Sequence, residues 1–256
     1  YVYFSTLMSK EMFIRRYSSA RRRLLISKYL FPLLVTHFHV RTCFFTIFCY
    51  SLINRKTSEK AERGIFMTKD LGVKPYLFPM PTYMIGTYNE DDTVDVMMMA
   101  WGGICAEDMV ALNLEAEHKT VANIETRKAF TLAVPGTDTL KESDFFGIAT
   151  SNKMADKFER SGLHAVKSTR VDAPVITEYP ITLECEVVEM QSQPYGLRVL
   201  GKIVNVIADE KVLDERGKID AGKLQAFAFD QMQNGYYAIG DKVGQAWHSG
   251  TEFMKK

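Results

Sequence analysis

Apolar and polar residues alternate along two long stretches in the second half of the chain. Residues 181–190 read ITLECEVVEM, which has the two-residue period of a half-buried β-strand, and residues 197–208 form a long partner after a turn at 191–196. Shorter apolar runs predict further strands at residues 83–88, 94–101, 110–114 and 130–134. Many strands with only short helices between them favour an antiparallel barrel.

Two short helices are predicted between these strands. Thr120 is suited to cap a helix over residues 120–128, and a second helix over residues 152–160 is closed by Gly162. The segment 74–81 contains three prolines in eight residues and is expected to run extended. Because strands and helices do not alternate regularly, a doubly wound fold is not expected.

The stretch from residue 95 to residue 120 is the best candidate for a binding site. Its two apolar runs flank a pair of glycines, and it ends in His118, Lys119 and Thr120. At the start of a helix, the Thr hydroxyl and the free N–H groups can donate to a phosphate, and Lys adds positive charge. Such a strand pair could hold a flat, phosphorylated ligand. The alternative is an ordinary helix cap with solvated charges.

A second polar cluster precedes the other predicted helix and consists of Thr150, Ser151, Asn152 and Lys153. It again offers hydroxyls, N–H groups and one cation, and it is again open to interpretation as a plain cap. A lysine at a helix start is electrostatically unfavourable unless an anion is bound there. Two such clusters in one chain raise the expectation of an anionic ligand.

Charge divides the chain into two segments, which we treat as separate units. Residues 1–66 carry 12 Lys and Arg against three Asp and Glu, a net charge of +9; the whole chain is +1, so residues 67–256 sum to −8. The acidic remainder argues against nucleic acid as a partner. The four cysteines form no CxxC pair, which fits a reducing, cytoplasmic setting with buried thiols and gives no zinc motif.

The basic segment 1–66 has no conventional interpretation as a targeting element. Its longest uncharged apolar run, residues 42–53, is too short for a membrane helix, and no small-residue cleavage site follows its basic part. We interpret it as non-native upstream sequence translated in frame, or as a disordered basic appendage. The functional domain is expected to span residues 67–256 and to open at Met67, with no membrane association.

Common catalytic motifs do not occur in the sequence. It contains no G-x-G-x-x-G after a strand, no G-x-x-x-x-G-K-[ST], no H-E-x-x-H and no G-x-S-x-G. The usual nucleotide-binding, zinc-protease and esterase classes therefore lose their best support. No metal site is expected either, because the pair His37 and His39 has no third ligand nearby in the sequence.

Several segments between about residue 76 and residue 247 follow, in order, the pattern of one family. They are VMMMAW (96–101), ALNL (111–114) with His118-Lys119-Thr120, FGIATSNK (146–153), ADKF (155–158), Gly162-Leu163, APVI (173–176), LEC (183–185), Asp230 and YYAIG (236–240). On these residues the chain resembles the flavin reductase-like family, which includes flavoredoxin and bacterial FMN-binding reductases. The match covers nearly all of residues 67–256 and leaves out residues 1–66.

The resemblance implies a mainly β protein with short helices, an FMN-binding split β-barrel. It further implies a cytoplasmic, bacterial flavoprotein, a homodimer with FMN at the subunit interface, and NAD(P)H as the electron donor. The expected function is NAD(P)H-dependent reduction of FMN. The alternative is a flavoredoxin-like electron-transfer protein, which keeps FMN bound, exchanges electrons with a redox partner protein and lacks NAD(P)H activity. A flavin-binding module without independent activity is a third reading.

The resemblance also assigns residues to the cofactor site, by position. They are Met98, Met99, Ala100, Trp101, His118, Lys119, Thr120, Thr150, Ser151, Asn152 and Lys153. No catalytic residue is named, because the flavin carries the redox chemistry. The chain departs from its relatives in Asp95, where they often have Asn, and in Thr150-Ser151, where they often have Ser-Gly. A carboxylate at residue 95 is unfavourable beside a reduced, anionic flavin unless it points away.

Overall fold

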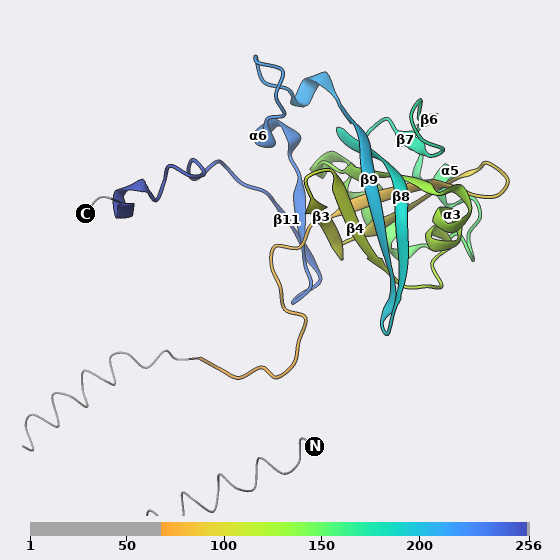
Figure 1. The fold of residues 1–256 in the computed structure, drawn as a ribbon, viewed down its shortest axis with the longest axis horizontal. Coiled ribbons are helices and arrows are strands. Elements are labelled where there is room, and N and C mark those ends of the chain that lie inside the picture. Colours follow the sequence, from red (N-terminus) through yellow and green to blue (C-terminus); the bar gives the residue numbers. More distant parts are fainter. Residues whose placement is uncertain (1–67, 255–256) are drawn as a thin grey trace, which may run out of the picture. The chain divides into compact units, whose positions relative to one another are not determined.

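Two long antiparallel strands, β8 (Ile181–Gln193) and β9 (Gly196–Ala208), dominate the computed structural model, which describes residues 68–254. They are joined by a tight turn at Pro194 and Tyr195 and are visible as the cyan and blue hairpin in Figure 1. Their pairing shifts register at two points, and such bulges bend a strand and increase its twist. The hairpin therefore curls instead of lying flat.

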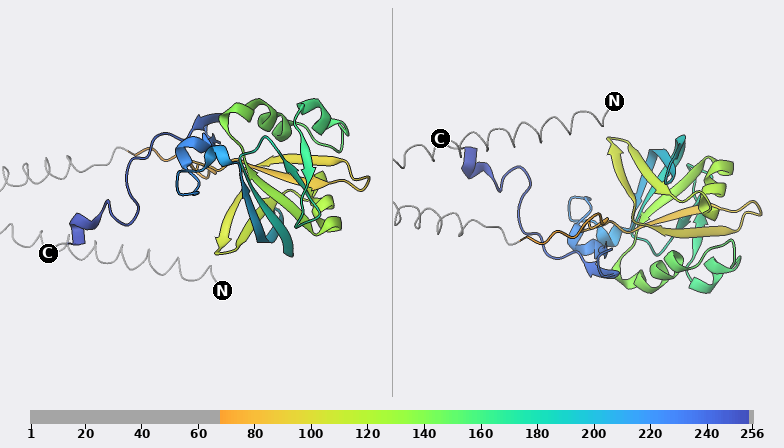
Figure 2. Two further views of the ribbon diagram at one scale, coloured as in Figure 1. Left: turned by 90° about the horizontal axis from the view of Figure 1, so that it is seen from above. Right: turned by 90° about the horizontal axis from the view of Figure 1, so that it is seen from below.

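The hairpin is the middle of a seven-stranded sheet in which every neighbouring pair is antiparallel. From one edge to the other, the strands are β2 (Val94–Met99), β1 (Tyr83–Tyr88), β5 (Ala129–Val134), β8, β9, β4 (Met109–Leu114) and β3 (Gly102–Ala106). Figure 2 shows the two ends of this sheet diverging, so that it forms a split barrel open on one side. The predicted fold class is confirmed.

Shorter elements complete the part of the chain that the structure describes. The helices are α3 (Lys119–Arg127), α4 (Leu140–Ile148), α5 (Lys157–Ser161) and α6 (Ala221–Leu224), with 3₁₀ turns η1 (Thr137–Thr139), η2 (Glu210–Val212) and η3 (Thr251–Met254). Two small antiparallel hairpins are β6 (Ala165–Lys167) with β7 (Pro174–Ile176), and β10 (Phe227–Asp230) with β11 (Gly235–Ala238). None of the helices between residues 68 and 254 has the length and hydropathy of a membrane span.

Apolar residues are buried on both faces of the sheet because side chains alternate along each strand. In β1, Ile85 packs with Val121 and Ile124 of α3 inside the barrel. Its neighbour Met84 points to the opposite face and packs with Phe146 of α4 and Phe158 of α5. The helices thus cover the two faces of the β2 end of the sheet.

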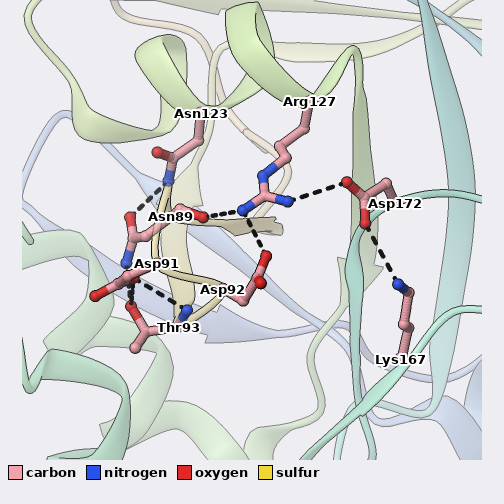
Figure 3. A network of polar contacts seen from close by, with 8 residues as sticks. All are labelled: Asn89, Asp91, Asp92, Thr93, Asn123, Arg127, Lys167 and Asp172. Carbon is pink, nitrogen blue, oxygen red and sulfur yellow. Dashed lines mark hydrogen bonds and ion pairs between the residues drawn. The ribbon is translucent and has the colours of Figure 1, made fainter.

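Arg127, the last residue of α3, joins three segments that are distant in sequence (Figure 3). Its guanidinium donates to Asp92 Oδ1 at 2.7 Å, to Asp172 Oδ2 at 3.2 Å and to the backbone carbonyl of Asn89. Asn123, one turn earlier in α3, donates to the Asn89 side chain at 2.9 Å. This network attaches the β1–β2 turn and the loop after β6 to α3.

Most strand predictions match the structure. The differences lie at strand ends, in the helices, and in the short strands β3, β6, β7, β10 and β11, which were not predicted. The run predicted as 94–101 ends at Met99, because the Trp101 carbonyl accepts the Asn113 N–H at 2.8 Å and turns the chain into β3. Helix α4 was not predicted either. The interpretation of residues 1–66 lies outside the described residues and stays a prediction.

The two predicted helix starts are wrong. Helix α3 begins at Lys119 with His118 in the N-cap position, and Thr120 lies inside the first turn. The helix predicted over residues 152–160 is reduced to α5, which begins at Lys157, although Gly162 does end it in a left-handed conformation with φ 71°. Residues 151–153 form turns instead, because their side chains bond to other segments and compete with helix formation.

Candidate functional site

A cleft of about 770 Å³ opens where β2 ends, beside the start of α3. Its apolar wall consists of three consecutive methionines, Met97, Met98 and Met99, followed by Trp101. The bend that ends β2 leaves Trp101 half-exposed at the rim. Polarisable thioethers beside an indole make a wall suited to a flat aromatic ligand.

Charged and polar side chains also line the cleft, namely Arg198 and His118 together with the carboxylates Glu115 and Asp144. His118 lies at the start of α3, and Arg198 reaches the cleft from β9, where it pairs with Asn113 of β4. The Nδ1 atom of His118 is buried without a hydrogen-bond partner among the described residues, while its Nε2 lies 3.6 Å from Glu115. A buried ring nitrogen without a partner is costly and suggests that a ligand atom occupies this position.

The third side of the cleft is formed by α4 and the β10–β11 hairpin. The Tyr236 hydroxyl donates to Asp144 Oδ1 at 2.7 Å, and both residues line the cleft. Burial, followed by the hydrogen bond and charge of Asp144, raises the pKa of Tyr236 above its ordinary value of 10. Tyr236 therefore stays protonated and remains a hydrogen-bond donor at neutral pH.

Just behind the cleft, Asp95 of β2 forms a buried polar cluster. Its carboxylate pairs with Lys157 Nζ at 2.7 Å, and both side chains are almost completely buried, 1% and 2% exposed. It also accepts hydrogen bonds from Thr120 Oγ1 at 2.9 Å and from Ser151 Oγ at 2.6 Å. Buried charges in proteins are normally paired, and Lys157 supplies the partner here.

The predicted site residues fall into two groups. Met98, Met99, Ala100, Trp101 and His118 line the cleft. The others, Lys119, Thr120, Thr150, Ser151, Asn152 and Lys153, are not among the described residues that line it. The structure nevertheless brings the two predicted polar clusters together, because Thr120 and Ser151 both bond to Asp95 and Asn152 Nδ2 donates to the Glu117 carbonyl at 2.9 Å.

Two predicted roles change with this geometry. The Thr120 hydroxyl is neither a helix cap nor a free phosphate donor, because its one proton is directed at Asp95. Lys153 is exposed in a turn four residues before α5 begins, so the argument from an unfavourable charge at a helix start no longer applies to it. Asp95 does not line the cleft, and its carboxylate is buried among its partners.

Several residues of the site were not predicted from the sequence. Arg198, Asp144 and Tyr236 come from β9, α4 and β11, which are distant in sequence from residues 95–120. The Asn234-Gly235 pair at the start of β11 is a typical hairpin signal that would have placed Tyr236 in a strand. A charged residue inside the apolar run VDVMMM likewise signals that Asp95 needs a buried partner.

Comparison with known proteins agrees with this architecture. Residues 76–225 match the family model of the flavin reductase like domain. The structure is similar to that of flavoredoxin from Desulfovibrio vulgaris (Miyazaki F), with a TM-score of 0.68 and 31% identity over 72% of this chain and 100% of that one. Flavoredoxin from Methanosarcina acetivorans shares the fold, with a TM-score of 0.66 and 23% identity over 73% of this chain and 100% of the other.

A relative known from its sequence covers a similar share of the chain. The uncharacterized protein YdfE of Bacillus subtilis (strain 168) is 22% identical over 199 residues, which cover 72% of this chain and 95% of YdfE. The family model covers more than half of the chain and includes the strand end, the start of α3 and the β8–β9 hairpin that form the cleft. The chain therefore belongs to the flavin reductase-like family.

Proposed function

We propose that this protein binds FMN in the cleft at the end of β2 and acts as an NAD(P)H-dependent oxidoreductase of the flavin reductase type. The observation that carries the proposal is the pairing, in one cleft, of an apolar Met and Trp wall with the cationic side chain of Arg198 and an unpartnered nitrogen of His118. Family membership gives it independent support.

The residues present fit such a ligand. A volume of about 770 Å³ lies within the range of about 300–1,000 Å³ that is usual for cofactor pockets. We assign Met98, Met99 and Trp101 to the isoalloxazine ring, and Arg198 with His118 to the polar groups of the ring and of the ribityl chain. Bound FMN supplies the capacity to accept a hydride and to pass on electrons, while the protein orients it and excludes water.

The Thr120 and Ser151 hydroxyls are retained in the proposed phosphate site as structural supports, while Lys119 and Lys153 supply charge. Lys119 is adjacent in sequence to Thr120, and Lys153 is adjacent to Asn152. Neither lysine is buried. A phosphate dianion attracts such cations even when they are hydrated. This arrangement favours FMN over riboflavin, which lacks the phosphate.

A homodimer is part of the proposal. Four large apolar side chains lie exposed in or near the cleft: Trp101 at 47%, Ile104 at 65%, Ile148 at 77% and Tyr195 at 68%. A second copy of the chain that covers them would bury apolar surface and close the open side of the site. Light scattering coupled to gel filtration is expected to give the mass of two chains, and the mass of one chain at all concentrations would contradict the dimer.

Anaerobic mixing of the FMN-loaded, full-length protein with NADH or NADPH tests the activity. We expect one of the two nucleotides to bleach the yellow flavin absorbance within the time of the assay. Retention of FMN without bleaching by either nucleotide would contradict the reductase activity. It would support the electron-transfer alternative. Dithionite, which reduces flavins directly, serves as the positive control.

A further inference from the structure

Asp95 joins three segments that are distant from each other in the sequence. It lies in the edge strand β2, and its carboxylate accepts from Thr120 in α3 and from Ser151 in the turn before α5. Lys157, the first residue of α5, completes the set at 2.7 Å. One carboxylate therefore ties β2, α3 and the 150–153 turn together, and we call these four residues the Asp95 clamp.

The clamp is neutral overall; Asp95, Lys157 and Thr120 are buried, and Ser151 is partly exposed. Lys157 offsets the charge of Asp95, and its Nζ also lies 3.5 Å from the Ala149 carbonyl and 5.9 Å from the centre of the Phe146 ring. These contacts satisfy the buried ammonium group from several sides, as a buried charge requires. The negative charge of Asp95 is therefore compensated locally and does not repel an anion that binds nearby.

Hydrogen-bond direction decides what the two hydroxyls can do. A hydroxyl has one proton to donate, and a carboxylate can only accept. Thr120 and Ser151 therefore both direct their protons at Asp95 and can offer a ligand only lone pairs. A second tie, from Asn152 Nδ2 to the Glu117 carbonyl, joins the same turn to the start of α3. Both polar clusters are thus held in place by this part of the molecule.

We propose that the Asp95 clamp positions the phosphate-binding part of the FMN site. Asp95 and Lys157 are positioning residues that touch no cofactor; they hold the start of α3 and the 150–153 turn side by side. Lys119, next to Thr120, and Lys153, two residues after Ser151, then meet the phosphate together with nearby backbone N–H groups. This inference rests on the proposed binding of FMN and adds how the chain gains selectivity for the phosphorylated flavin.

The test compares the affinity for FMN with the affinity for riboflavin, measured by quenching of flavin fluorescence on the full-length protein. The double variant Asp95→Leu/Lys157→Met removes the acceptor of both hydroxyl bonds together with the ion pair, and it leaves no buried charge unpaired. We expect it to bind FMN about tenfold more weakly, the loss of roughly one charge-assisted hydrogen bond, while its affinity for riboflavin changes little. The preference for FMN therefore falls.

The matched control is Asp156→Asn/Arg160→Met, which removes an ion pair of 2.8 Å at the same short helix. Both of its side chains are 56% exposed, so we expect no change in either affinity. Ser151→Ala, which removes a single clamp bond and leaves the ion pair intact, provides a milder variant in case the double variant fails to fold. It is expected to reduce FMN affinity several-fold and to leave riboflavin affinity unchanged.

The outcomes separate the inference from the function on which it rests. An equal loss of FMN and riboflavin affinity would mean that the clamp only supports the fold, and unchanged affinities would mean that it does not act on the site; either result overturns the inference. A wild-type protein that binds neither flavin refutes the proposed function itself, and the inference with it. A loss confined to FMN supports both.

Discussion

Thr120 illustrates how a single buried proton determines a residue's role. Thr120 lies in the first turn of α3 and is only 2% exposed. Its hydroxyl donates a hydrogen bond to the Asp95 carboxylate. Thr120→Val keeps the shape and leaves the carboxylate one partner short, so we expect the free energy of unfolding to fall by about 1–3 kcal/mol. Urea denaturation measures this change.

The control for this prediction lies in the same helix. The hydroxyl of Thr126 is exposed and donates to the Ala122 carbonyl, so Thr126→Val changes the same atoms without disturbing a buried group. We expect a change within about 0.5 kcal/mol. Equal effects of the two substitutions would contradict the importance of the buried bond.

The two cysteines that the structure describes should differ in reactivity. Burial, with the nearby Glu184 carboxylate, raises the pKa of the Cys185 thiol to about 12. Cys105 is exposed. Since the thiolate is the reactive form, brief treatment of the folded protein with iodoacetamide should modify Cys105 and spare Cys185. Peptide mapping by mass spectrometry measures this, and equal labelling of both would contradict the described core.

At the scale of elements, Arg127 is expected to hold the β1–β2 turn and the loop after β6 in place. The Arg127 side chain is 17% exposed and contacts two carboxylates and a carbonyl (Figure 3). Because its partners Asp92 and Asp172 are largely or partly exposed, we expect Arg127→Ala to cost only about 1–2 kcal/mol of unfolding free energy.

Arg160→Ala is the matched comparison for this network. It breaks one exposed pair within a helix and should cost less than about 0.5 kcal/mol. Hydrogen exchange provides a local readout, because Arg127→Ala should speed the exchange of amides in the β1–β2 turn. Unchanged exchange there would show that Arg127 does not hold the turn.

The β10–β11 hairpin is attached to α4 through Tyr236, and this contact makes stability depend on alkaline pH. The pKa of Tyr236 is raised in the folded state, so the unfolded chain releases the phenolic proton first, near its ordinary value of 10. The contribution of Tyr236 is fully present below that pH and is lost as the pH rises further.

Tyr236→Phe isolates this contribution, because all other tyrosines are shared with the wild type. Between about pH 9 and about pH 11, the wild type should lose more unfolding free energy than the variant. Denaturant midpoints at several pH values measure the difference. Parallel losses in the two proteins would contradict the buried, protonated state of Tyr236.

At the scale of the whole molecule, local sequence patterns predicted where the strands lie better than they predicted which strands pair with each other. Residues 83–88 form a strand with the predicted bounds, and the alternation after residue 181 correctly predicted the long hairpin. Helix α4 was not predicted, because its sequence LKESDFFGI buries only Ser143 and Phe146 and has no clear apolar stripe. The order of strands depends on contacts between distant segments, which a local period does not encode.

The residues of the candidate site also fall into those that the sequence predicted and those that it did not. The strand end and His118 were predicted, because a motif in one short stretch carries them. Arg198 and Tyr236 enter the cleft only through the pairing of β4 with β9 and the docking of a terminal hairpin. The role of Thr120 could not be predicted either, since the buried partner that takes its proton lies 25 residues earlier in the chain.

Titration of FMN with the purified, cofactor-free, full-length protein tests the central claim most directly. We predict saturable quenching of flavin fluorescence with one FMN bound per chain. Arg198→Ala should weaken the binding, because it removes a cation from the cleft wall while leaving the sheet intact. Fluorescence that stays unquenched at micromolar protein, or an affinity that Arg198→Ala leaves unchanged, would contradict the assignment of this cleft as the FMN site.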